Sequence, residues 1–197
     1  IVDDYITCEP LGMSQEDPTI VVTPVDTRRF VGGAGIVSAH AAVLGAGVRL
    51  LSVTGDDDAR DFAVRELRDC GVMAELFMDR TRPTTLKQRF RANEMTLLRV
   101  NHLHQASISV KQQNLIYEQF DELVSDCELL VFSDFNYGCL PQGLVDKITT
   151  RAREGGLTIA ADSQCSSQIG DISRFRGMDL LTPTEHEARV SLKNTED

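Results

Sequence analysis

Alternation of strand-like and helix-like segments constrains this chain more than any other feature of its sequence. Runs of β-branched and apolar residues are each followed by a segment whose apolar residues recur at helical spacing. The predicted helices cover residues 33–44, 56–71, 109–125 and 141–153, and the predicted strands cover residues 49–54, 128–134, 157–162 and 179–181. Such repetition predicts an α/β fold, a parallel sheet with helices on both faces. A further helix opens with a capping-box pattern at residues 182–185.

Two segments depart from this alternation. Residues 19–27 are rich in β-branched residues but include Pro24, which cannot donate to a central ladder, so they predict an edge strand. Residues 74–101 alternate as strands do and are broken at residues 81–83 and 93–94, a pattern typical of a hairpin. Residues 1–5 resemble the end of a strand. We therefore expect one domain over residues 1–197 with a small β appendage.

Composition and charge narrow the partners. The 197 residues, 42% hydrophobic and 25% charged, are typical of one folded domain. A net charge of −10 argues against binding to nucleic acid or to anionic membranes, which select basic surfaces. The five cysteines are scattered and form no C-x-x-C pair, so they indicate neither a disulfide framework nor a zinc site. With no signal peptide and no apolar run of about 20 residues, we expect a cytoplasmic protein that binds a small molecule.

Ligands of open parallel sheets bind beyond the carboxyl ends of strands, and this rule selects few positions. They are Gly32-Gly33, Gly55-Asp56, Asp134, Asp162 and residues 182–187. The glycine pair is the leading candidate, because a backbone without Cβ atoms allows a ligand to approach closely. The segment is not G-x-G-x-x-G, and no P-loop occurs, so Rossmann and Walker nucleotide sites lose support. For the acids at residues 56–58, helix capping is the alternative.

A second candidate is cationic. Lys87, Arg89 and Arg91 alternate with other residues in a predicted strand, which places three positive charges on one face. Arginine forks match the oxygens of a phosphate, so this face can serve a phosphorylated ligand. The alternative is a solvated strand face that discourages edge-to-edge aggregation. His102 and His104 would also share a strand face, and a metal role for them stays open.

Taken in order, several stretches resemble the PfkB-type, ribokinase-like carbohydrate kinases. The stretches are VDDY, SQEDP, FVGGAGIVSAHAAVLGA, LLSVTGDDDAR, PTTLKQRF with LLRV, VFSDFNYG, AADSQ and RFRGMDLLTPTEHE. Within that family, the chain is most similar to the heptose-7-phosphate kinase domain of the bifunctional ADP-heptose synthesis protein. The likeness covers nearly the whole chain and depends on the order and spacing of the stretches.

The resemblance implies ATP-dependent phosphoryl transfer to a sugar hydroxyl, with Mg²⁺, in a Rossmann-like α/β domain. A small β-sheet lid would use strands within residues 19–31 and 74–101, and two lids would pair into a homodimer. Residues assigned to sugar or sugar-phosphate binding by the resemblance are Asp3, Gly32, Gly33, Lys87, Arg89, Arg99 and Asp134. Residues assigned to the nucleotide are Asp162, Gln164, Thr184 and Glu187, of which Glu187 would also organise the magnesium ion.

The chain also departs from the family pattern. Ile36 and Thr184 stand where the family has asparagines, and Gln164 stands where the heptose kinases have a lysine. The family's catalytic base belongs to a G-A-G-D motif that does not occur up to Asp197, so we expect a truncated domain without its catalytic residue. Two readings follow: the sugar-binding portion of a kinase, inactive alone, or a degenerate, non-catalytic sugar-phosphate-binding protein. An NAD-dependent enzyme is disfavoured by the missing glycine fingerprint.

Overall fold

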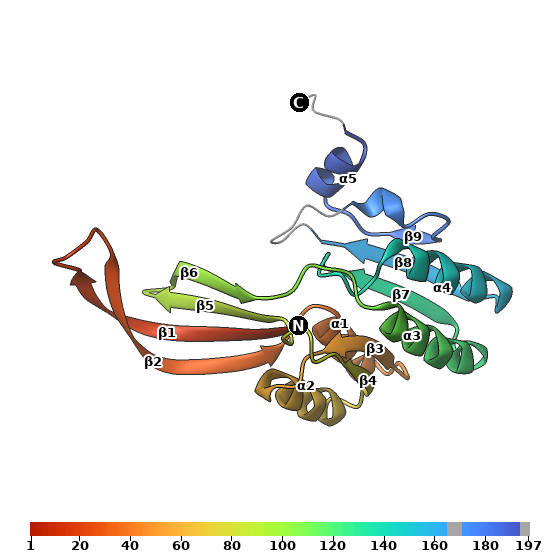
Figure 1. Ribbon diagram of the computed structural model, residues 1–197, viewed down its shortest axis with the longest axis horizontal. Helices are drawn as coiled ribbons and strands as arrows, with labels where there is room; N and C mark the ends of the chain where they lie inside the picture. The colour runs from red at the N-terminus through yellow and green to blue at the C-terminus, as the bar shows by residue number, and fades with distance from the viewer. Residues whose placement is uncertain (165–170, 194–197) are drawn as a thin grey trace. The chain divides into compact units, whose positions relative to one another are not determined.

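A four-stranded sheet dominates the first part of the computed structural model, which describes residues 1–164 and 171–193 (Figure 1). The chain divides into a first unit, residues 1–50 with 54–103, and a second unit, residues 51–53 with 104–197. The first unit contains β1 (Val2–Met13), β2 (Ile20–Val31), α1 (Ala34–Val43), α2 (Asp58–Asp69), β4 (Met73–Met78), β5 (Leu86–Ala92) and β6 (Met95–His102). Strand β3 (Arg49–Thr54) has residues in both units.

The strands of this sheet follow the order β2-β1-β5-β6. β1 is antiparallel to β2 and parallel to β5, and β6 returns antiparallel to β5. The edge position of β2 confirms the prediction from Pro24, which lies opposite Cys8 beside a register shift. The prediction for residues 1–5 was wrong: β1 begins at Val2 and continues to Met13, because β2 supplies a partner along its whole length.

The predicted hairpin is narrower than its sequence pattern. β5 and β6 form it, and its turn residues Asn93 and Glu94 both have positive φ, 47° and 66°, as a type I′ hairpin turn requires. β4 pairs instead with β3 in a separate two-stranded sheet. The break at residues 81–83 therefore separates a strand of one sheet from a strand of another.

The core of the first unit lies between α2 and the end of the four-stranded sheet that contains Val2 and Val31. Alternate residues of β1 from Val2 to Cys8 are buried, as the two-residue period of a strand dictates. α2 buries Ala59, Ala63 and Leu67, which are four residues apart and so share one helix face. They form one cluster with Val2, Val31 and Val72. Asp57 caps the helix by accepting from the Arg60 amide at 3.0 Å.

The second unit contains a parallel sheet of order β7-β8-β9. Its elements are α3 (Val110–Leu123), η1 (Val124–Asp126), β7 (Leu129–Asp134), α4 (Gln142–Glu154), β8 (Thr158–Ser163), η2 (Ile172–Arg174), β9 (Leu180–Leu181) and α5 (Glu185–Ser191). α4 packs on β8 and against α3 (Figure 1). The buried residues Leu144, Ile148 and Ala152 recur every four positions along α4.

These elements confirm the predicted βαβ alternation, and each lies within two residues of its predicted range. Consecutive parallel strands need a crossover, and α4 supplies the crossover from β7 to β8. In residues 1–164 and 171–193, no helix has the length and apolarity needed to cross a membrane.

Candidate functional site

The Gly32-Gly33 turn joins the end of β2 to the start of α1. Gly33 caps α1 with a φ of 54°, in the left-handed region that favours glycine. The Gly32 amide donates to the carbonyl of Ile1 at 3.0 Å, and the Gly35 amide donates to the carbonyl of Gly32 at 3.1 Å. The predicted arrangement of strand, glycine turn and helix is therefore confirmed.

Asp3 lies directly against this turn. A Cβ atom on residue 32 would be 1.9 Å from Asp3 Oδ2 and 2.9 Å from Asp3 Cγ. Only a glycine at residue 32 leaves room for the carboxylate in this position. The turn and the carboxylate thus form one unit, in which the acceptor lies beside the buried Gly32 and the half-buried Gly33.

Arg89 holds the other side of the Asp3 carboxylate. Its Nη1 donates to Asp3 Oδ1 at 2.6 Å, and its guanidinium lies 5.0 Å from the centre of the Tyr5 ring. Tyr5 in turn contacts Phe30 edge to face, with the ring centres 5.8 Å apart. The predicted phosphate ligand Arg89 is therefore engaged within the protein, where it fixes the orientation of Asp3.

Strand register brings the other predicted cations to the same face of the sheet. Lys87 pairs with Asp3, and Arg89 pairs both with Tyr5 and with Arg99. Paired residues share a face, so Lys87, Arg89 and Arg99 lie on the face that carries Asp3. Lys87 is buried and Arg99 is exposed. On a protein of net charge −10, the face that carries Asp3 thus includes the cations Lys87, Arg89 and Arg99, a set suited to a polar, anionic ligand.

Arg91 serves the hairpin turn instead. Its Nη2 donates to the carbonyl of Glu94 at 2.9 Å. His102 forms a hydrogen bond through Nε2 with Gln88 Oε1 at 3.0 Å. Among residues 1–164 and 171–193, no group of three or more His, Cys, Asp or Glu side chains is arranged to hold a metal ion. The metal role for His102 and His104 thus gains no support from the described residues.

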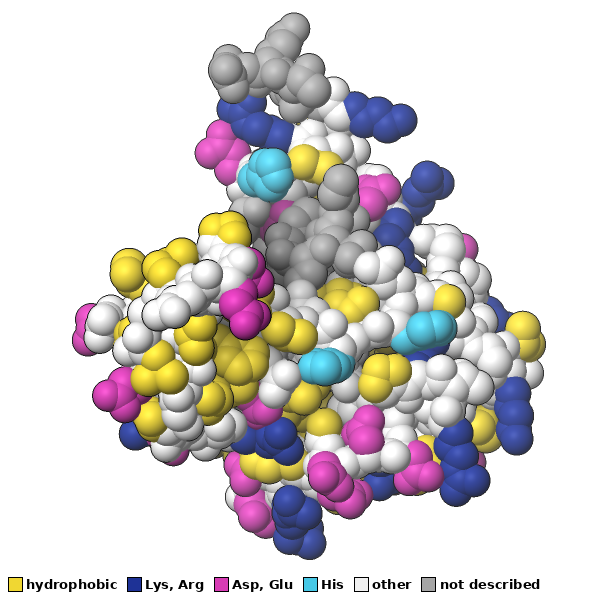
Figure 2. Space-filling model, turned by 60° about the vertical axis from the view of Figure 1, so that its left-hand side comes forward, with side chains coloured by type: hydrophobic (Ala, Val, Ile, Leu, Met, Phe, Trp, Pro, Cys, Tyr) yellow, Lys and Arg dark blue, Asp and Glu magenta, His cyan; other side chains and the backbone are white. Residues whose placement is uncertain are grey.

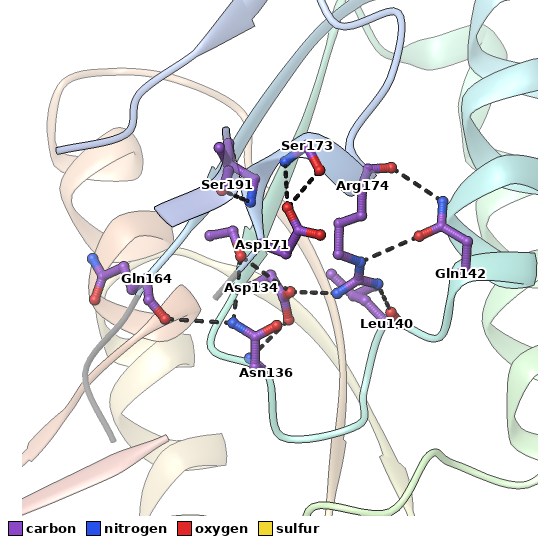
Figure 3. A network of polar contacts seen from close by, with 11 residues as sticks. Asp134, Asn136, Leu140, Gln142, Gln164, Asp171, Ser173, Arg174 and Ser191 are labelled. Carbon is purple, nitrogen blue, oxygen red and sulfur yellow. Dashed lines mark hydrogen bonds and ion pairs between the residues drawn. The ribbon is translucent and has the colours of Figure 1, made fainter. Parts of the chain in front are cut away.

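A second polar cluster surrounds Asp134, the last residue of β7 (Figure 3). Asp134 is 3% exposed, and burial raises the pKa of its carboxyl even though the Asn136 amide and Arg174 favour the charged form. Oδ1 accepts from the Asn136 amide at 3.0 Å, and Oδ2 accepts from Arg174 Nη1 at 2.6 Å. Ser163 Oγ adds a contact to Oδ2 at 3.5 Å. A role for Asp134 in sugar binding stays a prediction, since both oxygens already have protein donors.

The residues predicted for the nucleotide lie at the end of β8, directly after it, and beyond β9. Asp162 Oδ1 accepts from Thr182 Oγ1 at 3.2 Å. Gln164 is exposed, and its backbone amide donates to the backbone carbonyl of Asp134 at 3.0 Å. The helix α5 does begin with a capping box, but two residues later than predicted, at Thr184 and Glu187. The Glu187 backbone amide donates to Thr184 Oγ1 at 3.3 Å, and Glu187 Oε2 accepts from the Thr184 backbone amide at 2.8 Å.

Sequence reasoning missed three residues of these clusters. Arg174 is 40 positions from Asp134, and nothing in a single sequence pairs them. Tyr5 contacts Arg89 only because of the register between β1 and β5, and the residues around Tyr5 in the sequence do not indicate that register. Asn136 has a φ of 58°, and an asparagine two residues beyond a strand end was the one available signal, because asparagine tolerates this conformation.

Comparison with known proteins identifies the class. The profile of the pfkB family of carbohydrate kinases matches residues 4–197, and the chain belongs to this family. It is 30% identical to the bifunctional protein HldE of Campylobacter jejuni subsp. doylei over 193 residues, 98% of this chain and 40% of that protein. It is 28% identical to the bifunctional protein HldE of Pelobacter propionicus over 192 residues, 97% of this chain and 38% of that protein. The chain thus spans about 40% of the length of these relatives.

Solved structures confirm the ribokinase-like α/β fold. A carbohydrate kinase from Agrobacterium tumefaciens superposes with a TM-score of 0.69 at 16% identity, over 96% of this chain and 60% of that one. Ribokinase of Arabidopsis thaliana, solved with ribose and ATP, gives a TM-score of 0.68 at 16% identity, over 95% of this chain and 58% of that one. Phosphofructokinase-2 of Escherichia coli, solved with fructose-6-phosphate, gives 0.67 at 15% identity, over 98% of this chain and 61% of that one.

Proposed function

We propose that this chain is the sugar-binding portion of a kinase that uses ATP to phosphorylate a sugar or sugar phosphate similar to heptose 7-phosphate. The observation that carries the proposal is the Asp3 carboxylate, fixed by Arg89 in space that only Gly32 leaves open. Membership of the pfkB family and similarity to two HldE proteins support a phosphorylated sugar as substrate.

The residues of the first unit have separate roles in this proposal. Asp3 accepts hydrogen bonds from sugar hydroxyls, and Gly32-Gly33 allow the sugar ring to approach the backbone. Lys87 and Arg99 neutralise the phosphate, and Arg89 contributes by holding Asp3. Because the carboxylate is oriented before the sugar arrives, binding orders little of the protein, which favours affinity.

Asp162, Gln164, Thr184 and Glu187 form the proposed nucleotide side. Magnesium is usually held by one or two carboxylates together with water and substrate phosphates. Glu187 fits as one such carboxylate, although its capping-box bonds already hold Oε2. ATP would supply the phosphoryl group when bound. No residue of this chain is assigned as catalytic base, so we expect the chain alone to be inactive.

The proposal includes pairing of two copies through the four-stranded sheet. Hydrophobic side chains gather on this sheet in Figure 2. Exposed members are Leu11, Met13, Ile20, Val25, Met95 and Leu98. A second copy would cover them, because exposed apolar patches on edge strands favour self-association. Light scattering should show a dimer that Val25→Lys dissociates and that Val110→Lys, on the exposed start of α3, leaves intact. A monomer in both variants and in the unmodified protein would contradict the pairing.

Ligand titration tests the proposed substrate. Thermal unfolding of the full protein is followed with heptose 7-phosphate, fructose 6-phosphate and unphosphorylated heptose. We expect stabilisation by at least one sugar phosphate, because a ligand that binds only the folded state raises its stability. Asp3→Asn should abolish the shift, whereas Asp26→Asn, an exposed acid on β2, should keep it. Absence of stabilisation by every sugar phosphate would contradict the proposal.

A second function is favoured by three positions. Ile36, in α1, offers no polar atom where the family has an asparagine, and Thr184 and Gln164 replace polar or charged residues of the nucleotide side. These positions support a non-catalytic, sugar-phosphate-binding protein in the cytoplasm. Consumption of ATP by the full protein in the presence of the bound sugar phosphate distinguishes the two. Binding without consumption would favour the second function.

A further inference from the structure

The loop of residues 135–141, between β7 and α4, has a demanding backbone. Asn136 and Gly138 have positive φ values of 58° and 75°. A Cβ atom on residue 138 would lie 2.1 Å from the carbonyl oxygen of Ala106, so this part of the loop packs against backbone. A left-handed conformation at a non-glycine residue such as Asn136 persists only where the surrounding contacts hold it.

Arg174, from a different part of the chain, contacts the loop and the residues at both of its ends. Its Nη1 donates to Asp134 Oδ2, its Nη2 donates to the carbonyl of Leu140, and its Nε lies 3.4 Å from Gln142 Oε1 (Figure 3). Gln142 Nε2 donates back to the carbonyl of Arg174 at 3.1 Å. One guanidinium therefore reaches the residue before the loop, the loop itself and the first residue of α4.

The surroundings of Arg174 restrict its own movement. Its guanidinium carbon lies 4.8 Å from the centre of the Phe175 ring, and Phe175 packs against Phe132 of β7 with ring centres 5.5 Å apart. The side chain of Arg174 is 18% exposed, and that of Asp134 is 3% exposed. A planar fork with fixed donors in a largely dry site holds its acceptors at fixed positions.

From this geometry we infer that Arg174 is a positioning residue, which holds the loop of residues 135–141 in one conformation for sugar binding. Asp134 is the anchor of this arrangement, since its two oxygens join the Asn136 amide on one side to Arg174 on the other. The part of the inference that concerns sugar rests on the proposed function and, within it, on the sugar-binding role predicted for Asp134. The part that concerns the loop does not.

Amide hydrogen exchange tests the loop without any substrate. The amide of Asn136 donates to Asp134 Oδ1, and the amide of Ile108 donates to the carbonyl of Gly138 at 2.9 Å, so both report on the loop. In Arg174→Ala, we expect their exchange to accelerate at least about tenfold, while amides of β8 keep their protection. Arg176→Ala is the matched control, because Arg176 is an exposed arginine two residues away. Equal exchange of the two reporter amides in both variants would overturn the inference.

A lysine variant separates position from charge and covers the case in which Arg174→Ala fails to fold. Arg174→Lys keeps a cation for Asp134, but an ammonium cannot reach Asp134, Leu140 and Gln142 together. We expect intermediate exchange of the Asn136 and Ile108 amides. Full protection in the lysine variant would show that charge alone suffices, and that result would also overturn the inference.

Steady-state kinetics of the full protein test the link to sugar. Arg174→Ala should raise the KM for the sugar phosphate about tenfold, with a smaller change in kcat and none in the KM for ATP. An unchanged sugar KM in a variant whose loop has lost protection would overturn the substrate part. If the unmodified protein phosphorylates no sugar, the proposed function fails, while the exchange measurements still decide the role of Arg174.

Discussion

The carboxylate of Asp3 occupies the space that a side chain on residue 32 would need, with Oδ2 1.9 Å from the position of the missing Cβ. Glycine is therefore required at residues 32 and 33 for two different physical reasons. Gly33 is required by its left-handed φ of 54°, whereas Gly32 is required by its neighbour. The glycine turn and the acid are therefore interdependent, although 29 positions separate them in the sequence shown.

Replacing Gly32 tests this dependence. In Gly32→Ala the new methyl group displaces the Asp3 carboxylate and disturbs its 2.6 Å contact with Arg89. We expect a loss of about 1–3 kcal/mol in the free energy of unfolding, typical of overpacking, and weaker binding of the sugar phosphate. The chain has no Trp, so circular dichroism is the convenient probe of unfolding. Gly47→Ala is the control, because a Cβ there meets open space. Equal stabilities of the two variants would contradict this interpretation.

The cations on the Asp3 face should differ in selectivity. Arg99 is exposed and lies opposite Arg89. Arg99→Ala should therefore lower the affinity for a phosphorylated sugar by about ten- to a hundredfold, the usual range for a hydrogen bond to a charged group. An unphosphorylated sugar should be affected little. Arg89→Ala should lower the affinity for both the phosphorylated and the unphosphorylated sugar, because it releases the Asp3 carboxylate. Isothermal titration measures these affinities, with Arg65→Ala, an exposed arginine of α2, as the control. Equal losses of both sugars in Arg99→Ala would exclude a phosphate role.

Period and turn chemistry predicted most of the fold. The strand and helix periods located β7, α4 and β8 within one residue, because these elements have one buried face each. The sequence could not predict which distant strands pair with each other. Nothing in the local sequence distinguishes β4, which pairs with β3, from β5, which pairs with β1. Likewise, the alternation of Lys87 and Arg89 predicted a cationic face, but only the register with β1 shows that Arg89 is bound to Asp3.

Asp79 should make stability sensitive to acid. The Thr81 hydroxyl donates to Asp79 Oδ1 at 2.6 Å and, with the Thr81 amide and Arg82, lowers the pKa of Asp79 against the effect of burial. Its contribution is therefore fully present above the unfolded pKa of about 3.9 and is lost as pH falls through the lower folded pKa. Asp79→Asn should cost about 3 kcal/mol near pH 6, because it leaves Arg82 without its carboxylate.

The difference between Asp79→Asn and the unmodified protein isolates this residue from other acids. Urea unfolding at pH 6 and at pH 3 should show that difference shrinking at the lower pH. Asp26→Asn removes an acid whose ion pair with Arg28 is exposed at both side chains, and it should change stability by less than about 1 kcal/mol at either pH. A constant difference for Asp79→Asn across this range would contradict the assigned pKa direction.

Substitution of Asp4 tests whether the stability of the four-stranded sheet near the start of β1 depends on a buried ion pair. The carboxylate is 1% exposed and accepts from Arg29 Nε at 2.7 Å and Nη2 at 2.9 Å, and the hydrogen bond raises the pKa of Arg29. The Arg29 guanidinium also lies 5.7 Å from the centre of the Phe62 ring of α2.

Asp4→Asn should lower the free energy of unfolding by about 3 kcal/mol, because the amide places donors against the arginine donors. Arg29→Met should cost at least as much, since it leaves a buried carboxylate without its cation. The double variant Asp4→Leu with Arg29→Met should recover most of the loss, because an apolar pair removes both desolvated charges. A double-mutant cycle of Asp4→Leu, Arg29→Met and the double variant, each followed by urea unfolding, measures the coupling. Additive losses would show that the two side chains contribute independently, and that packing rather than the ion pair stabilises this part of the sheet.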